Sequence, residues 1–159
     1  MEQYTSTDQG GASLVMEDCR TFGCIGHGVC CNGKLEATRC MFENNGNDGV
    51  CVNGGEAMLV DCVVCNNERS GVYVVNDSKH VLTAGTISGN KRHGVLALRD
   101  GKVTVAAAEY SEVDREQTVS SGNRGHNWAT QKGTFGERGE IEGLAEGIQA
   151  VGLVESDSD

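Results

Sequence analysis

Short hydrophobic segments alternate with polar turns along most of the chain, and they recur at a nearly fixed interval. The pair Gly-Val marks the repeat, starting at Gly28, Gly49, Gly71 and Gly94, so that successive copies are 21, 22 and 23 residues apart. Between these pairs, β-rich segments of three to five residues are bounded by Asn, Gly, Asp and Ser, which favour turns. The pattern predicts short strands joined by tight turns and repeated about every 22 residues.

Residues at equivalent positions of successive repeats are alike. Three columns, counted nine and four residues before each glycine and three after it, are Cys19, Cys40, Cys62 and Gly85; Cys24, Asn45, Asn67 and Asn90; and Cys31, Val52, Val74 and Ala97. A repeat this short has room for three strands and three turns, and no hairpin turn recurs in every copy. We therefore expect an all-β coil that advances one strand spacing, about 4.8 Å, per repeat and pairs each strand with its equivalent in the next rung.

The copies resemble the repeats of right-handed parallel β-helix proteins, which include pectate lyases and the sugar-hydrolase and F-box-associated β-helix modules. The resemblance is carried by segments such as Cys62–Asn67 followed by Gly71–Val74, and it covers about residues 13–110. It implies a single-stranded right-handed parallel β-helix, or solenoid, of about 4–5 rungs. It leaves the function open, because this fold hosts lyases, hydrolases, epimerases, adhesins and interaction scaffolds.

Alternation in the strand after each glycine predicts which side chains face the core. The first and third residues after the glycine should point inward, and the second, which is Cys30, Cys51, Tyr73 or Leu96, should point outward. We expect each corner glycine to adopt a backbone conformation that is closed to bulkier residues. The Asn column should bond to backbone amides and to its neighbours in adjacent rungs.

The repeat also divides the chain into segments. We expect a lead-in over 1–10, the β-helix over 11–135 with an acidic insertion at 109–118, a capping segment over 136–152 and a disordered acidic tail over 153–159. The next candidate corner after Gly94 is Gly125. The segment Ile141–Val151 is either a last strand or a poor helix, since its apolar residues have helical spacing but glycines interrupt it.

Charge and apolar content exclude two classes of partner. The 159 residues include 13 basic and 23 acidic side chains, for a net charge of −10, which argues against nucleic acid and anionic membranes. No apolar run approaches the roughly 18 residues of a membrane span, and the N-terminus lacks the pattern of a secretory signal. We expect a cytoplasmic protein with a protein partner, or a polysaccharide as the second choice.

The eight cysteines raise the question of a metal ion or a disulfide. Cys62 and Cys65 form a C-x-x-C pair, but no second pair accompanies it, so we expect small core-filling thiols and neither a metal nor another cofactor. Cys30 and Cys51 lie one rung apart, within disulfide distance, but parallel stacked side chains are poorly aimed for that bond. Reduced thiols are expected in a chain without a secretory signal.

Two sets of residues are candidates for catalysis. His27, Asp48, Ser70 and His93 precede the four corner glycines, and a His, an Asp and a Ser in one column resemble a nucleophile constellation, although all are turn positions. Asp77 and Asp100 are stacked neighbours six residues after their glycines, as the acids of a glycosidase or a calcium-dependent lyase would be. Calcium is expected only in the lyase case, and turns favour Asp in any event.

A third set is a candidate for partner binding. Arg69 and Arg92 stack two residues before their glycines, and Tyr73 is the one plausible outward aromatic residue of the repeats. We therefore predict a non-enzymatic β-helix scaffold or protein-interaction module, which could belong to a longer repeat array. The alternative is a carbohydrate-active enzyme, a polysaccharide lyase or glycoside hydrolase, or a fragment of one. The sequence does not identify the partner, the substrate or the oligomeric state.

Overall fold

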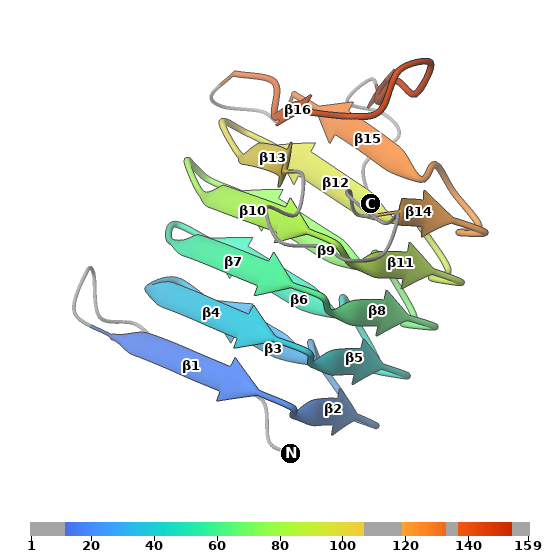
Figure 1. Cartoon of the computed structure of the whole chain (residues 1–159). Coiled ribbons are helices and arrows are strands. Elements are labelled where there is room, and N and C mark those ends of the chain that lie inside the picture. Colours follow the sequence, from blue (N-terminus) through green and yellow to red (C-terminus); the bar gives the residue numbers. More distant parts are fainter. Residues whose placement is uncertain (1–11, 107–118, 133–136, 154–159) are drawn as a thin grey trace.

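The chain winds into a stack of parallel β-coils. The structure is a computed structural model that describes residues 12–106, 119–132 and 137–153. In these residues it contains seventeen strands, every strand pairing is parallel, and there is no helix. Figure 1 shows the coils stacked from β1 at one end to β15 and β16 at the other. The predicted all-β solenoid is confirmed, with about five turns.

Three sheets run along the stack. The first, sheet A, consists of β1 (Ser13–Glu17), β4 (Lys34–Thr38), β7 (Glu56–Val60), β10 (Lys79–Thr83), β13 (Lys102–Ala106) and β16 (Glu140–Glu142). Sheet B consists of β2 (Arg20–Phe22), β5 (Met41–Glu43), β8 (Val63–Cys65), β11 (Thr86–Ser88) and β14 (Val119–Ser121). Sheet C consists of β3 (Val29–Cys31), β6 (Val50–Asn53), β9 (Val72–Val75), β12 (Val95–Leu98), β15 (Trp128–Gln131) and β17 (Val151–Leu153).

Each strand pairs in register with its equivalent in the next coil. In sheet C, for example, Val50 is opposite Val72, and Val72 is opposite Val95. The columns counted from the sequence are therefore columns in space. Like side chains stack because a parallel coil places equivalent residues one strand spacing apart.

The core fills the centre of the coil with the predicted inward residues. Val, Leu, Ile and Phe side chains from all three sheets form one continuous cluster, and the inward residues of sheet C from Val29 to Ala97 are no more than 1% exposed. The outward position is less exposed than the alternation predicts, because Cys51 is 4% and Leu96 is 9% accessible. Leu96 belongs to a second apolar cluster on the outer face of sheet C, with Ala129, Leu153 and half-buried Tyr73.

A ladder of asparagine side chains runs up the stack beside sheet B. Oδ1 of Asn67 accepts hydrogen bonds from the backbone N–H of Asn45 at 3.1 Å and from its Nδ2 at 3.0 Å. Asn90 receives the same two bonds from Asn67, and Asn123 receives them from Asn90. The ladder satisfies polar groups that would otherwise be buried without a partner, which explains why the sequence keeps Asn in this column.

The expected reason for glycine at the corners is wrong. None of Gly28, Gly49, Gly71 and Gly94 has a positive φ. A Cβ on Gly71 would instead lie 2.7 Å from Nδ2 of Asn90 and 2.8 Å from the carbonyl oxygen of Gly94. The corner requires glycine because the Asn ladder and the next coil leave no space for a side chain.

The fifth coil turns at Asn127, not at the expected Gly125. Trp128 is opposite Val95, so Asn127 is the equivalent of Gly94. The insertion between the fourth and fifth corners hides this register in the sequence. Oδ1 of Asn127 accepts bonds from the N–H of Asn123 at 3.4 Å and from its Nδ2 at 3.0 Å, so this side chain ends the ladder inside its own coil.

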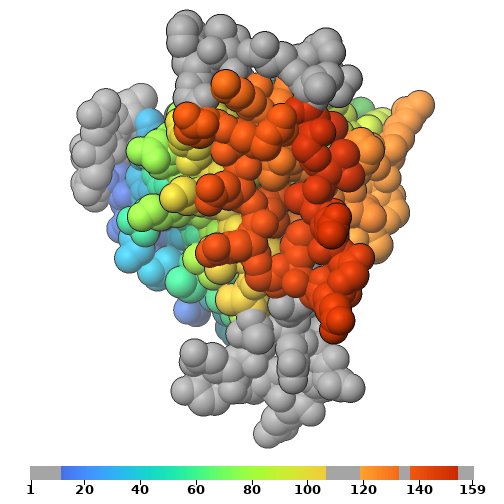
Figure 2. Space-filling view, turned by 90° about the horizontal axis from the view of Figure 1, so that it is seen from above, coloured from blue at the N-terminus to red at the C-terminus, as the bar shows by residue number. Residues whose placement is uncertain are grey.

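Two short strands cover the last complete coil. Of the two alternatives for Ile141–Val151, the strand is correct, but it is divided into β16 and β17, and sheet B gains no strand in this coil. Figure 2 shows these C-terminal residues spread over the end of the stack. Leu153, which the sequence analysis assigns to the tail, ends β17 and is 5% exposed. The expected lead-in at 1–10 and the acidic insertion at 109–118 lie outside the described residues.

The described residues contain no helix that is long and apolar enough to cross a membrane.

Candidate functional site

A shallow groove follows the turns that lead into the strands of sheet C, and we call it the corner groove. It has a volume of about 210 Å³, below the roughly 300–1,000 Å³ of pockets that enclose small ligands. It is lined by His27, Asn47, Asp48, Arg69, Ser70, Tyr73, Arg92, His93, Leu96, Leu98 and Gln131. Seven of the nine candidate residues singled out from the sequence therefore meet here, although they come from four different coils.

Two arginines and a tyrosine give the corner groove positive charge and an aromatic surface. The N–H of Arg92 donates to the carbonyl oxygen of Arg69 at 3.0 Å, so the two residues occupy the same position on neighbouring coils. Tyr73 lies half-buried beside Leu96 in sheet C, and its burial raises the pKa of its hydroxyl, while the neighbouring Arg99 opposes that rise. The groove thus combines two cationic side chains with an aromatic and an aliphatic surface.

His27 and Asp48 form an ion pair at the N-terminal end of the groove. Nδ1 of His27 is 3.3 Å from Oδ2 of Asp48 and 3.3 Å from the backbone nitrogen of Asp48. Neutral Nδ1 accepts the backbone N–H, whereas protonated Nδ1 donates to the carboxylate. The hydrogen bond with Asp48 raises the pKa of His27 above its ordinary value, against the opposing effect of partial burial.

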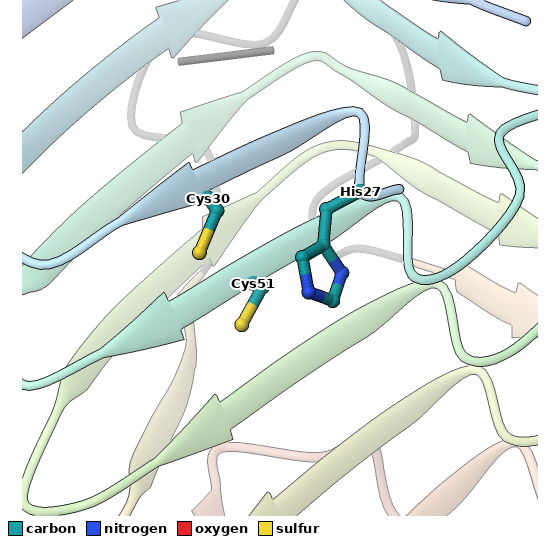
Figure 3. Close-up of side chains that lie close together, drawn as sticks. All are labelled: His27, Cys30 and Cys51. Atoms are coloured by element: carbon teal, nitrogen blue, oxygen red, sulfur yellow. The ribbon is translucent and has the colours of Figure 1, made fainter. Parts of the chain in front are cut away.

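Two cysteines lie next to His27. Cys30 and Cys51 are register partners on β3 and β6, and Figure 3 shows their thiols side by side with the imidazole of His27 close to them. One ligand atom from each of the three residues lies within 4.8 Å of the other two. A hydrogen bond from the Cys51 thiol lowers the pKa of Cys30 to about 6, and the same interaction, together with burial, raises the pKa of Cys51.

Two imidazoles stack at the other end of the same column. The rings of His93 and His126 are nearly parallel, with centroids 5.5 Å apart. Nδ1 of His93 accepts the backbone N–H of His126 at 3.0 Å. This bond repeats the one between His27 and Asp48, so each of the two histidines links its coil to the next.

His27 is not placed to act as the base of a catalytic triad with Ser70. Asp48 separates His27 from Ser70, and its Oδ1 accepts the backbone N–H of Ser70 at 2.9 Å. His27 and Ser70 are two coils apart, about 10 Å at the usual strand spacing. A histidine at that distance cannot take a proton from the serine hydroxyl, so these three residues lack the contact that activates the nucleophile.

Asp77 and Asp100 lie away from the corner groove, in the turns between sheets C and A. The register of the flanking strands makes them neighbours on adjacent coils, as the sequence predicts. Both have left-handed φ angles, of 62° and 66°, and Oδ1 of Asp100 accepts the backbone N–H of Glu137 at 3.0 Å. Asp77 lines a wider hollow of about 710 Å³ together with Lys34, Glu56 and Lys79.

The Cys–His cluster is not predicted from metal-ligating residues that stand close together in the chain. Cys62 and Cys65 have that spacing, but Cys62 is buried and bonds the carbonyl oxygens of Ala37 and Val60. Two spacings in the sequence, taken together, identify the cluster. His27 stands three residues before Cys30, and Cys51 is the next member of the Cys30 column.

Comparison with protein-family models gives one match. A family described as the right-handed β-helix region matches residues 7–84 and 23–122, which together cover well over half of the chain. Neither the comparison with curated proteins nor the comparison with solved structures gives a match.

Proposed function

The chain belongs to the right-handed β-helix family, and we propose that it is a non-enzymatic interaction module whose corner groove binds a carboxylate side chain of a partner protein. The observation that carries this proposal is the stacking of Arg69 and Arg92 beside half-buried Tyr73 in one groove. Arginine forms two parallel hydrogen bonds with a carboxylate, and Tyr and Arg are the side chains that contribute most often to the binding energy of protein interfaces.

The size of the groove supports a protein partner over a free small molecule. At about 210 Å³ it accommodates a single side chain rather than enclosing a whole ligand. Leu96, Ala129 and Leu153 beside it are buried, so half-buried Tyr73 is the apolar side chain that the rest of a partner segment can contact. The net charge of the chain is −10, but at physiological salt charges more than about 8 Å away are largely screened, so the charged side chains that line the groove, Arg69, Arg92 and Asp48, have the largest effect there.

A displayed library of random peptides, selected against the full chain, tests the proposal. We expect the selected peptides to be enriched in Asp and Glu next to apolar residues, and to lose binding at least tenfold in the double variant Arg69→Glu/Arg92→Glu. The matched control is Lys34→Glu/Lys102→Glu, which makes the same change of charge on exposed residues of sheet A and should leave binding unchanged. Equal binding to both double variants, or selected peptides without acidic residues, would contradict the proposal.

The second candidate function is a carbohydrate-active enzyme, which the pairing of Asp77 and Asp100 on adjacent coils favours. Two carboxylates at such a spacing can act as acid and nucleophile in a retaining glycosidase or bind calcium in a lyase. Incubation with pectin, alginate and related polyuronides, with and without calcium, separates the two candidates. Product that disappears in Asp77→Ala would favour the enzyme and count against the interaction module.

A further inference from the structure

The proposed binding of a carboxylate rests on Arg69, Arg92 and Tyr73 and does not use the Cys–His cluster of His27, Cys30 and Cys51. Its ligand atoms lie within 4.8 Å of one another, at the junction of the first two coils. His27 and Cys30 are half-buried, and Cys51 is buried. Sulfur and imidazole nitrogen are the donors that zinc prefers in proteins, and no other cluster of three metal-ligating side chains occurs in the described part of the chain.

The fold creates this cluster from residues that are apart in the sequence. The corner turns the chain so that His27 lies beside the outer face of sheet C, three residues before Cys30. The parallel register then places Cys51 opposite Cys30 on the next strand. All three positions are fixed by the backbone of the coil, so the ligands are held on rigid elements before any ion binds.

We propose that His27, Cys30 and Cys51 bind a zinc ion. Zinc–sulfur bonds of about 2.3 Å and zinc–nitrogen bonds of about 2.0–2.1 Å place tetrahedral ligand atoms about 3.5–3.8 Å apart. The cluster reaches that geometry by a contraction of about 1 Å, which side-chain rotation supplies. The two thiol protons pass to solvent when the ion binds.

Asp48 is not a ligand of the ion, but it contacts the ligand His27. Its carboxylate is 3.3 Å from Nδ1 of His27, which leaves Nε2 for the ion. A zinc-bound histidine usually donates its other ring N–H to a carboxylate, which fixes the ring and increases the basicity of the ligating nitrogen. Three protein ligands leave a fourth position of the tetrahedron for water or a group of a partner.

The main competing state of the two thiols is a disulfide. Cys30 and Cys51 are reduced in the structure, and side chains that stack in parallel on neighbouring strands do not approach the dihedral angle that a disulfide prefers. The two states are distinguishable, because a disulfide consumes both thiols and abolishes metal binding. A thiol count under oxidising and reducing conditions measures its share.

Titration of the reduced, metal-free full chain with Co²⁺ tests the proposal. We expect one Co²⁺ per chain, with sulfur-to-cobalt charge-transfer absorption and the visible bands of tetrahedral cobalt, and displacement of Co²⁺ by one equivalent of Zn²⁺. The absorption should vanish in Cys30→Ser and His27→Ala, while Cys24→Ser and Cys65→Ser, which change thiols outside the cluster, should keep it. Asp48→Asn should retain the stoichiometry but weaken zinc binding about 10- to 100-fold.

Three results would overturn the proposal. They are the absence of charge-transfer absorption in the reduced wild-type chain, the same absorption in the Cys30→Ser and His27→Ala variants, and loss of binding in the Cys24→Ser control. Circular dichroism of every variant shows whether the β-coil is intact, so a folding defect is not mistaken for the loss of a ligand. No partner is needed for this experiment, so its outcome is independent of the proposed carboxylate binding.

Discussion

At the scale of single residues, the most demanding position is the middle of the asparagine ladder. Asn67 is fully buried, and its side chain accepts two bonds from Asn45 and donates to the carbonyl oxygen of Phe42 at 3.1 Å and to Oδ1 of Asn90 at 2.9 Å. Replacement by a shorter apolar residue leaves several of these groups buried without a partner. Each such group costs about 1–3 kcal/mol.

We therefore expect Asn67→Ala to lower the free energy of unfolding by at least about 3 kcal/mol. Urea denaturation followed by circular dichroism measures the change. The control is Asn53→Ala, because Asn53 is exposed and accepts one bond, from Asn76, so its loss should cost less than about 1 kcal/mol. Equal effects of the two substitutions would show that the ladder does not stabilise the coil.

A buried histidine, His80, places two unpaired polar nitrogen atoms in the core. His80 is 1% exposed, stacks between Ala57 and Val103 in sheet A, and neither ring nitrogen has a hydrogen-bond partner in the described residues. Burial lowers its pKa from 6.5 to about 3. The folded state therefore keeps the imidazole neutral at pH values where the unfolded chain protonates it.

We expect His80→Leu to stabilise the protein by about 1–3 kcal/mol at pH 7, because it removes an unpaired polar group from the core. The sign of the pH effect follows from the lowered pKa. Above pH 6.5 His80 is neutral in both the folded and the unfolded state, so its protonation does not change the free energy of unfolding. As the pH falls from 6.5 towards 3, only the unfolded state binds the proton, and the free energy of unfolding of the wild type falls by up to about 1.4 kcal/mol per pH unit. Denaturation curves of both proteins at pH 7, 6 and 5 should diverge, and parallel curves would refute this account.

Residues also show where inference from the sequence succeeds. The Cys, Asn and Val columns were countable because their members stand at constant distances from one glycine, and the register confirms each of them. The demand for glycine at the corner was predictable, but its cause was not, since the space is taken by Asn90 and Gly94 from another coil. The Cys–His cluster escaped for the same reason, as its three ligands meet only across two coils.

At the scale of elements, one coil is a removable unit. Residues 50–71 contain β6, β7 and β8, and their deletion joins Gly49 to Val72, which restores the Gly-Val corner. The strands β3, β4 and β5 then meet β9, β10 and β11, and Asn45 meets Asn90. Because the stability of a repeat protein is approximately a sum over repeats and their interfaces, the loss should be roughly one fifth of the total.

We expect this deletion variant to fold with the same β-sheet circular dichroism and to unfold cooperatively at a lower urea concentration. Removal of 21 residues, 50–70, is the control. It leaves an extra residue at the corner, and a shift of one residue turns every inward side chain of the following strand outward. The control should lose cooperative unfolding, and equal stability of the two deletions would contradict the argument from register.

At the scale of elements, some strands can be predicted from the sequence and others cannot. The strands of the first four coils follow one template and could be placed from it. The fifth corner could not, because the segment before it breaks the template and Asn127 stands where a glycine is expected. The last two strands carry no repeat signal, so only their apolar residues indicated a cover for the stack.

At the scale of the whole molecule, the ends of the stack determine how readily its strands pair with those of another molecule. The last complete coil presents β13 and β15, and each has its outer edge paired, with β16 and β17 respectively. Ile141 packs against the main core, and Leu153 closes the second apolar cluster on sheet C. A chain that ends at residue 132 loses these strands and exposes two unpaired strand edges beside apolar side chains, which is an arrangement that favours pairing with another molecule.

We expect the chain shortened to residues 1–132 to keep its β-sheet circular dichroism but to form oligomers as its concentration rises. Size-exclusion chromatography with light scattering measures the oligomers, under conditions where the full chain should form none. Thr104→Lys in the shortened chain supplies the contrast, because Thr104 lies in the middle of the exposed edge strand β13 and a charge there opposes pairing between edges. This substitution should restore the monomer, at least in part. A shortened chain that stays monomeric at every concentration would mean that β16 and β17 do not protect the end of the coil, while oligomers that Thr104→Lys leaves unchanged would locate the association at another surface.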